Sequence, residues 1–361
     1  MNTEKPGKKI EKKAILLRVL IVVIVVTFGA LLVRKLLNQI SIFDIKEAFF
    51  GMYGPTLIGA FAVLLIGNFF RAYRKNILVG SDRIGMGDMF LVSMIRNAFN
   101  MVLPARTGEL SYIYVLTNRF KFPLEVGVAT LMVALIFDLA IVFSLIVIAI
   151  IIVGINAYSI SSVSVILIAA ALLIFSLLIL FYIANIIDFV LIAYRKILNR
   201  FKVRENRLIY RIYKKLLDTG KNLKIIKERK IYWKVYLSSI AIRVLKFTGY
   251  YLIIHAILSP IAMGGYKFSD LNFWEILLAT AAAEISAVLP THALAGFGTY
   301  EYAFAVPLMV LGFSENTALI TGFTYHLVVL LYTVVLGILS MIIISMPFYR
   351  IKKNKPEENK L

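Results

Sequence analysis

Two short stretches of this chain place charged side chains between long apolar runs. The first, NMVLPARTGELSY at 100–112, contains Arg106 and Glu109, and the second, SAVLPTHALAGFGTYEYA at 286–303, contains Glu301. A planar guanidinium group matches the oxygens of a phosphate, while a carboxylate can orient a neighbouring group or carry a proton. These residue types therefore indicate a polar site for an anionic group inside an apolar protein.

Further polar residues interrupt apolar segments, where a charged side chain at the bilayer centre costs about 2.5–3.5 kcal/mol on insertion scales. Arg96 and Asn100 are four residues apart, so they share one helix face. The candidate substrate-binding residues are Arg96, Asn100, Arg106, Glu109, Asp138, Glu284, His292, Glu301 and His326. Two interpretations remain open. These residues bind an anionic headgroup, or they pair with each other, for instance Arg106 with Glu109 or Arg96 with Glu284.

The composition is that of a helical membrane protein with several spans. Sixty per cent of the residues are hydrophobic, the mean hydropathy is +0.86, and several apolar stretches exceed the length that a membrane span needs. We predict full spans at 14–37, 53–71, 124–155, 163–187, 235–258 and 315–346. The chain contains no cysteine, which excludes disulfides and thiolate metal sites.

Two apolar segments are too short to cross a membrane. The segments 88–103 and 274–289 would each reach about 24 Å as a helix, against a hydrocarbon core of about 30 Å. A proline follows each segment directly, which disfavours continuation of the helix, and a second short apolar segment comes next. We therefore predict two re-entrant helical hairpins, at 88–119 and 274–312.

The distribution of Lys and Arg gives the predicted topology. With the N-terminus in the cytoplasm, the inside segments hold 31 of these residues and the outside segments hold 4, with 71–86 counted inside. Both termini are then cytoplasmic. The order span, hairpin, span occurs twice with opposite orientation, in 53–155 and 235–346, which is typical of an inverted-topology repeat. We interpret Arg243 and Lys246 as reaching to the inner membrane surface.

The segment 186–234 is strongly basic and carries apolar residues at near-helical spacing. We expect it to form one or two cytoplasmic amphipathic helices on the inner leaflet, and a docking surface for a partner or an acidic lipid is the alternative. The net charge of +20 is attributed to this topology, and we expect no binding of nucleic acid. No P-loop, dinucleotide or zinc-protease motif is found, so we expect no enzyme activity, cofactor or metal.

Paired motifs carry a resemblance to a known family. In the first half they are Leu103-Pro104-x-Arg106-x-Gly108-Glu109 followed by Asp138, and in the second Leu289-Pro290, Gly296-Phe297-Gly298-x-x-Glu301 and Ala318. At these residues the chain resembles the flippase-like transmembrane region of the lysylphosphatidylglycerol synthases and its stand-alone relatives, over roughly 14–346. One departure is Tyr300, which stands where arginine is common in the family.

The resemblance implies that lipid moves between leaflets through a cavity between the two hairpins. Our interpretation is an all-α polytopic protein, with 1–361 as a single membrane domain, in the plasma membrane. It would act as a flippase-like transporter of an anionic or phosphate-bearing lipid. The alternatives are an intramembrane enzyme acting on a lipid-linked phosphate or sugar, or a membrane scaffold. The expected partners are membrane lipids, and the sequence leaves a homo-oligomer open.

Overall fold

The computed structural model describes residues 40–103, 107–157, 207–287 and 294–346, together with a few isolated positions. Every regular element in these ranges is a helix. The α-helices are α2 (Ile42–Phe50), α3 (Gly54–Val79), α4 (Met86–Val102), α5 (Glu109–Asn118), α6 (Leu124–Ala157), α8 (Arg207–Glu228), α9 (Tyr232–Leu258), α10 (Phe273–Ser286), α11 (Thr299–Val310) and α12 (Glu315–Ser345). Short 3₁₀ turns occur at Ile261–Met263, Phe268–Asp270 and Leu294–Gly296.

Four helices in the described part of the chain are long and apolar enough to cross a membrane. They are α3, α6 over Leu124–Gly154, α9 and α12. They coincide with four of the six predicted spans, while the predicted spans 14–37 and 163–187 lie outside the described residues. The protein is therefore an all-helical, multi-pass membrane protein.

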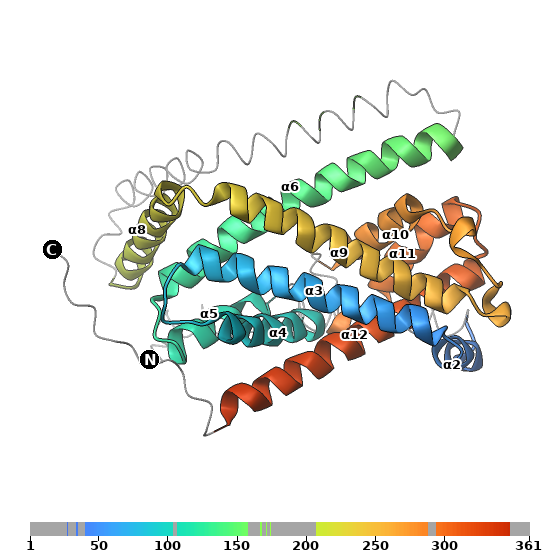
Figure 1. Ribbon diagram of the computed structural model, residues 1–361, viewed down its shortest axis with the longest axis horizontal. Coiled ribbons are helices and arrows are strands. Elements are labelled where there is room, and N and C mark those ends of the chain that lie inside the picture. Colours follow the sequence, from blue (N-terminus) through green and yellow to red (C-terminus); the bar gives the residue numbers. More distant parts are fainter. Residues whose placement is uncertain are drawn as a thin grey trace, which may run out of the picture.

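Four shorter helices pack in two pairs, α4 with α5 and α10 with α11 (Figure 1). The 17 residues of α4 rise about 25 Å and the 14 residues of α10 about 21 Å, less than a hydrocarbon core of about 30 Å. At the end of α4, Leu103 is extended (ψ 141°), as expected for a residue before proline. The second break comes earlier than predicted, because α10 ends at Ser286 rather than at 289.

Helix α3 continues well beyond its predicted end at residue 71. It ends only at Gly80, which adopts the left-handed conformation (φ 59°) and donates its N–H to the carbonyl of Asn76 at 2.8 Å. Arg229 also donates to the last carbonyls of α3, at 2.8 Å for Ile77 and 3.1 Å for Leu78. Hydropathy falls after residue 70, but no proline or glycine interrupts the helix until Gly80. The predicted end of this span at residue 71 was therefore wrong, because the helix continues to Val79.

Helices of the first half of the chain pack directly against helices of the second half (Figure 1). α3 lies along α9, α4 lies along α12, and α10 contacts α6. A Cβ added at Gly337 of α12 would overlap the Cβ of Ala98 on α4, and one at Gly249 of α9 would lie 2.6 Å from Leu64 of α3. Small residues thus permit the close helix approach that is common in membrane proteins.

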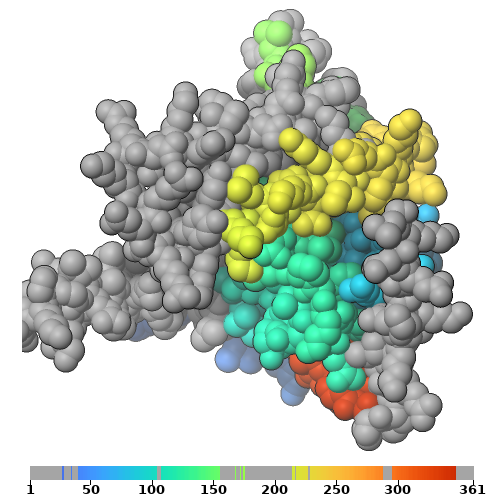
Figure 2. All heavy atoms as spheres, turned by 90° about the vertical axis from the view of Figure 1, so that its left-hand side faces the viewer, coloured from blue at the N-terminus to red at the C-terminus, as the bar shows by residue number. Residues whose placement is uncertain are grey.

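The described part of the basic segment is helix α8, which lies beside the start of α6 at one end of the molecule (Figure 2). Its apolar residues Leu223 and Ile226 pack in a cluster with Ala129 and Val133 of α6. Lys215 of α8 pairs with Glu125 at 2.9 Å. Part of the apolar face of this amphipathic helix therefore covers protein. Its contact with the inner leaflet remains a prediction.

Candidate functional site

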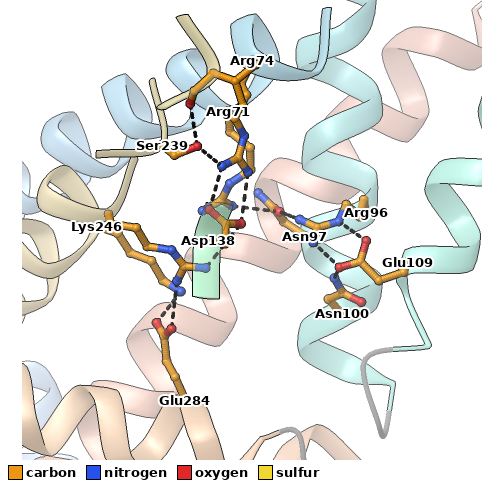
Figure 3. Close-up of polar contacts among 12 residues, drawn as sticks. Arg71, Arg74, Arg96, Asn97, Asn100, Glu109, Asp138, Ser239, Lys246 and Glu284 are labelled. Carbon is orange, nitrogen blue, oxygen red and sulfur yellow. Dashed lines mark hydrogen bonds and ion pairs between the residues drawn. The ribbon is translucent and has the colours of Figure 1, made fainter. Parts of the chain in front are cut away.

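A cavity of about 500 Å³ lies among the helices and is lined by residues of α3, α4, α5, α6, α9, α10, α11 and α12. This volume is in the usual range for small-ligand sites. Charged and amide side chains from both halves of the chain converge on it (Figure 3).

The first helix pair contributes a bidentate arginine–carboxylate pair. Arg96 of α4 donates through Nε to Oε2 of Glu109 at 2.6 Å, and its Nη2 pairs with Oε1 of the same carboxylate. Asn100, one turn after Arg96, donates to Oε1 of Glu109 at 3.1 Å. Glu109 begins α5, where the helix dipole favours a negative charge. The pair thus joins α4 to α5 across the break between them.

Gly108 makes this geometry accessible. A Cβ at this position would overlap the backbone of Phe99 and the side chain of Asn100. Because glycine has no Cβ, the start of α5 approaches α4 closely enough for Glu109 to reach Arg96. This explains why a glycine precedes the glutamate in the first motif.

Asp138 of α6 holds a second cluster together. It accepts hydrogen bonds from Nη1 and Nη2 of Arg74 at 2.7 and 3.0 Å, and Nη2 of Arg243 lies 3.3 Å from its Oδ2. Arg74 also donates to Ser239 of α9 at 2.6 Å. One carboxylate therefore ties together α3, α6 and α9.

Glu284 of α10 extends this cluster into the second helix pair. Its Oε2 lies 3.3 Å from Nη1 of Arg243, and its Oε1 pairs with Lys246. Arg243 thus bridges Asp138 and Glu284, which lie on different halves of the chain. Desolvated charges of this kind are costly unless they are paired, and each of the two carboxylates here pairs with two cations.

Arg71 connects the first helix pair to this network through neutral amides. Its Nη1 donates to Asn97 at 2.9 Å and to Asn68 at 3.4 Å, and Asn97 in turn donates to Asn68 at 3.2 Å. Across the described lining, six cationic side chains face three carboxylates, a formal surplus of three positive charges. The cations are Arg71, Arg74, Lys75, Arg96, Arg243 and Lys246, and the carboxylates are Glu109, Asp138 and Glu284.

Most of the predicted site residues that the structure describes lie in this cavity. Its lining includes Arg96, Asn100, Glu109, Asp138 and Glu284. Two other candidates, Arg106 and His292, lie outside the described residues. The pairing of Arg96 with Glu284, one of the alternatives expected from the sequence, is wrong. Arg96 pairs with Glu109, while Glu284 pairs with two cations of α9.

The structure places Glu301 and His326 away from the cavity lining. Both side chains are fully buried, with Oε1 of Glu301 at 2.5 Å from Nδ1 of His326. The other oxygen of Glu301 accepts the N–H of Gly298 at 2.6 Å, which caps the start of α11. Tyr300, which does line the cavity, stacks on the ring of His326 at 4.3 Å. This pair therefore joins α11 to α12 behind the cavity wall.

Sequence reasoning missed five cations of the cavity. Arg71, Arg74 and Lys75 were counted in the inside segment 71–86, and Arg243 and Lys246 were interpreted as reaching to the membrane surface, but all five line the cavity. A signal existed for α3, because Asn68, Arg71 and Lys75 follow the three- and four-residue spacing of one helix face. No group of three or more His, Asp or Glu residues suited to a metal ion occurs in the described ranges.

Comparison with known proteins agrees with the resemblance seen in the motifs. Among curated proteins, none matches this chain. Among protein families, the lysylphosphatidylglycerol synthase TM region matches residues 15–337, which is nearly the whole chain. The match includes both helix pairs and every charged residue of the cavity. The chain therefore belongs to the family of the lysylphosphatidylglycerol synthase TM region.

Proposed function

We propose that this protein moves an anionic or phosphate-bearing lipid between the leaflets of the plasma membrane. The headgroup enters the cavity while the acyl or prenyl tails stay in the surrounding lipid. The observation that carries the proposal is the cavity itself, which presents six cations against three carboxylates among long apolar helices. Keeping such a surplus in an apolar protein is expensive without an anion to compensate it.

The helix order supports alternating access as the mechanism. Span, short helix pair and span occur as α3, α4–α5 and α6, and again as α9, α10–α11 and α12. The contacts between the two halves show the same correspondence. α3 packs against its counterpart α9, α4 of the first half packs against α12 of the second, and α10 of the second half packs against α6 of the first. Under this proposal the short pairs are re-entrant hairpins of an inverted-topology repeat, both termini are cytoplasmic, and rocking of one half against the other opens the cavity to each leaflet.

The carboxylates have distinct roles in this proposal. Glu109 holds Arg96 in place when the cavity is empty, and an incoming phosphate competes with it for the guanidinium group. Asp138 and Glu284 hold Arg74, Arg243 and Lys246 toward the cavity. The anion thus meets cations that are already oriented, which lowers the entropy lost on binding.

The test is a leaflet-exchange assay with the purified protein in liposomes. Fluorescent phosphatidylglycerol is placed in both leaflets, and dithionite then removes the signal of the outer leaflet. The variant is Arg71→Gln. Among the described residues Arg71 donates hydrogen bonds to the neutral side chains of Asn68 and Asn97, so the change leaves no carboxylate of these ranges without its partner. The matched control is Arg119→Gln, since Arg119 lies outside the cavity and donates to the carbonyl of Ile344.

We expect wild type and Arg119→Gln to expose inner-leaflet lipid at the same rate. Arg71→Gln should slow this step by about 10- to 100-fold, because a charge-assisted hydrogen bond contributes about 1.5–3 kcal/mol. Absence of exchange in wild type, with native host lipids also tested, would overturn the proposal. A new lipid product in the same vesicles, detected by mass spectrometry, would favour the enzyme alternative instead.

A further inference from the structure

Two cations of α3 have no carboxylate partner among the described residues. Within the described ranges, Arg71 donates to the amide oxygens of Asn97 and Asn68. Lys75 is 2% exposed, and its Nζ has no hydrogen-bond partner in the described part of the chain. The Nζ lies 4.3 Å from the centre of the Tyr112 ring, a contact that stabilises a cation only modestly. A buried ammonium group without an anion is costly, so this position is suited to a charge that arrives with a ligand.

Arg96 lies in the same part of the cavity. Asn97 accepts hydrogen bonds from Arg71 at 2.9 Å and from Arg96 at 3.2 Å, so the two guanidinium groups meet at one amide oxygen. Lys75 follows Arg71 by one turn of α3, and Tyr112 beneath it follows Glu109 by one turn of α5. We refer to Arg71, Lys75 and Arg96 as the α3–α4 cation cluster.

The surplus charge of the cavity is concentrated in this cluster. Its three formal positive charges face one carboxylate, that of Glu109, which leaves a surplus of two. In the rest of the cavity, Asp138 and Glu284 face three cations, which leaves a surplus of one. A single phosphodiester carries one negative charge and would compensate only half of the excess at the α3–α4 cation cluster.

We propose that the α3–α4 cation cluster binds a doubly charged phosphate group, a phosphomonoester or a terminal diphosphate, in preference to a singly charged phosphodiester. The planar guanidinium groups of Arg71 and Arg96 present N–H donors to two phosphate oxygens, and Lys75 supplies a point charge to the third. This inference rests on the proposed lipid-binding role of the cavity and specifies the headgroup. The same chemistry is shared by a lipid phosphomonoester and by a soluble one.

The experiment compares two probes that differ by one methyl group on the phosphate. Dioctanoyl phosphatidic acid carries two negative charges at about pH 8, whereas dioctanoyl phosphatidylmethanol carries one. Binding of each to the purified full-length protein in detergent is measured by isothermal titration. Glycerol 3-phosphate and inorganic phosphate form two further arms, which separate a lipid ligand from a soluble phosphate.

We expect wild type to bind phosphatidic acid at least about tenfold more tightly than phosphatidylmethanol, because the second negative charge lies close to three cations in a partly desolvated site. Lys75→Met should reduce this ratio toward one, since it removes one of the two surplus charges. Lys221→Met is the matched control, because Lys221 is an exposed residue of α8 that pairs with Asp218, and it should leave the ratio unchanged.

Equal affinity of wild type for the two probes would overturn the inference, and this result does not depend on the folding of any variant. An equal loss for both probes in Lys75→Met would also overturn it, because Lys75 would then provide only general attraction. Glycerol 3-phosphate binding as tightly as phosphatidic acid would assign the site to a soluble phosphomonoester. If the wild-type protein binds the doubly charged probe more tightly but exchanges no lipid between leaflets, only the transport proposal is refuted.

Discussion

Replacement of Asp138 by asparagine is the sharpest test of the charge network. The amide keeps the shape of the side chain but removes the negative charge that lies 2.7 Å from Arg74 and 3.3 Å from Arg243. The Arg74 side chain is 2% exposed, so its charge has little access to water. Breaking a buried pair by removing one partner costs about 3–5 kcal/mol. Arg74 keeps its hydrogen bond to Ser239 and Arg243 keeps its ion pair with Glu284, so we expect a loss of about 3 kcal/mol, at the lower end of this range.

The assay is reversible unfolding in mixed micelles as the fraction of dodecyl sulfate rises. Trp233 and Trp274, the two tryptophans of the chain, report the transition by fluorescence. Asp218→Asn is the matched control, because Asp218 is 35% exposed and pairs with Lys221, which is 74% exposed. A surface pair contributes at most about 1 kcal/mol, so this variant should lose no more than that.

A double-mutant cycle isolates the interaction. Arg74→Met and Asp138→Asn together should cost less than the sum of the two single variants, with a coupling energy of about 1–3 kcal/mol. The reasoning is refuted if Asp138→Asn loses less than about 1 kcal/mol and the coupling is zero. In that case water in the cavity, rather than the carboxylate, would compensate the two arginines.

Two further changes test the packing and the second buried pair. Gly337→Ala should lower the free energy of unfolding by about 1–3 kcal/mol in the same assay, because its Cβ would overlap Ala98, whereas Gly59→Ala, with nothing within 4 Å, should cost nothing. Equal effects of these two variants would contradict the close packing of α12 on α4. Glu301→Gln should lower stability by about 1–3 kcal/mol, because His326 and the N–H of Gly298 lose a buried charged partner. Its affinity for phosphatidic acid in the titration should stay within about twofold of wild type, and a larger loss would place Glu301 in the binding site.

The sequence predicted the class of protein and the position of its breaks. The length of an apolar stretch identifies a membrane span directly, because a helix needs about 20 consecutive apolar residues to cross the membrane. The break after α4 was predicted closely, since Pro104 fixes where the helix cannot continue. The end of α10 was less accurate, because the helix stops at Ser286 before its proline is reached.

Arg96, Asn100 and Glu109 were also predictable as a group. They are close in the sequence, and the spacing of Arg96 and Asn100 places them on one helix face. The structure adds that Glu109 accepts hydrogen bonds from both. Such local pairings depend on helix geometry, which a single sequence largely determines.

Only the tertiary structure decided how the distant charges pair and which of them face the cavity. Arg74 and Asp138 are 64 residues apart, and Arg243 and Glu284 are 41 apart. Hydropathy identifies Arg71, Arg74 and Lys75 as polar positions, but it does not indicate the direction in which their side chains point from the helix. It therefore cannot separate a cytoplasmic loop from the wall of a polar cavity, because that distinction depends on where α3 packs against α4, α6 and α9.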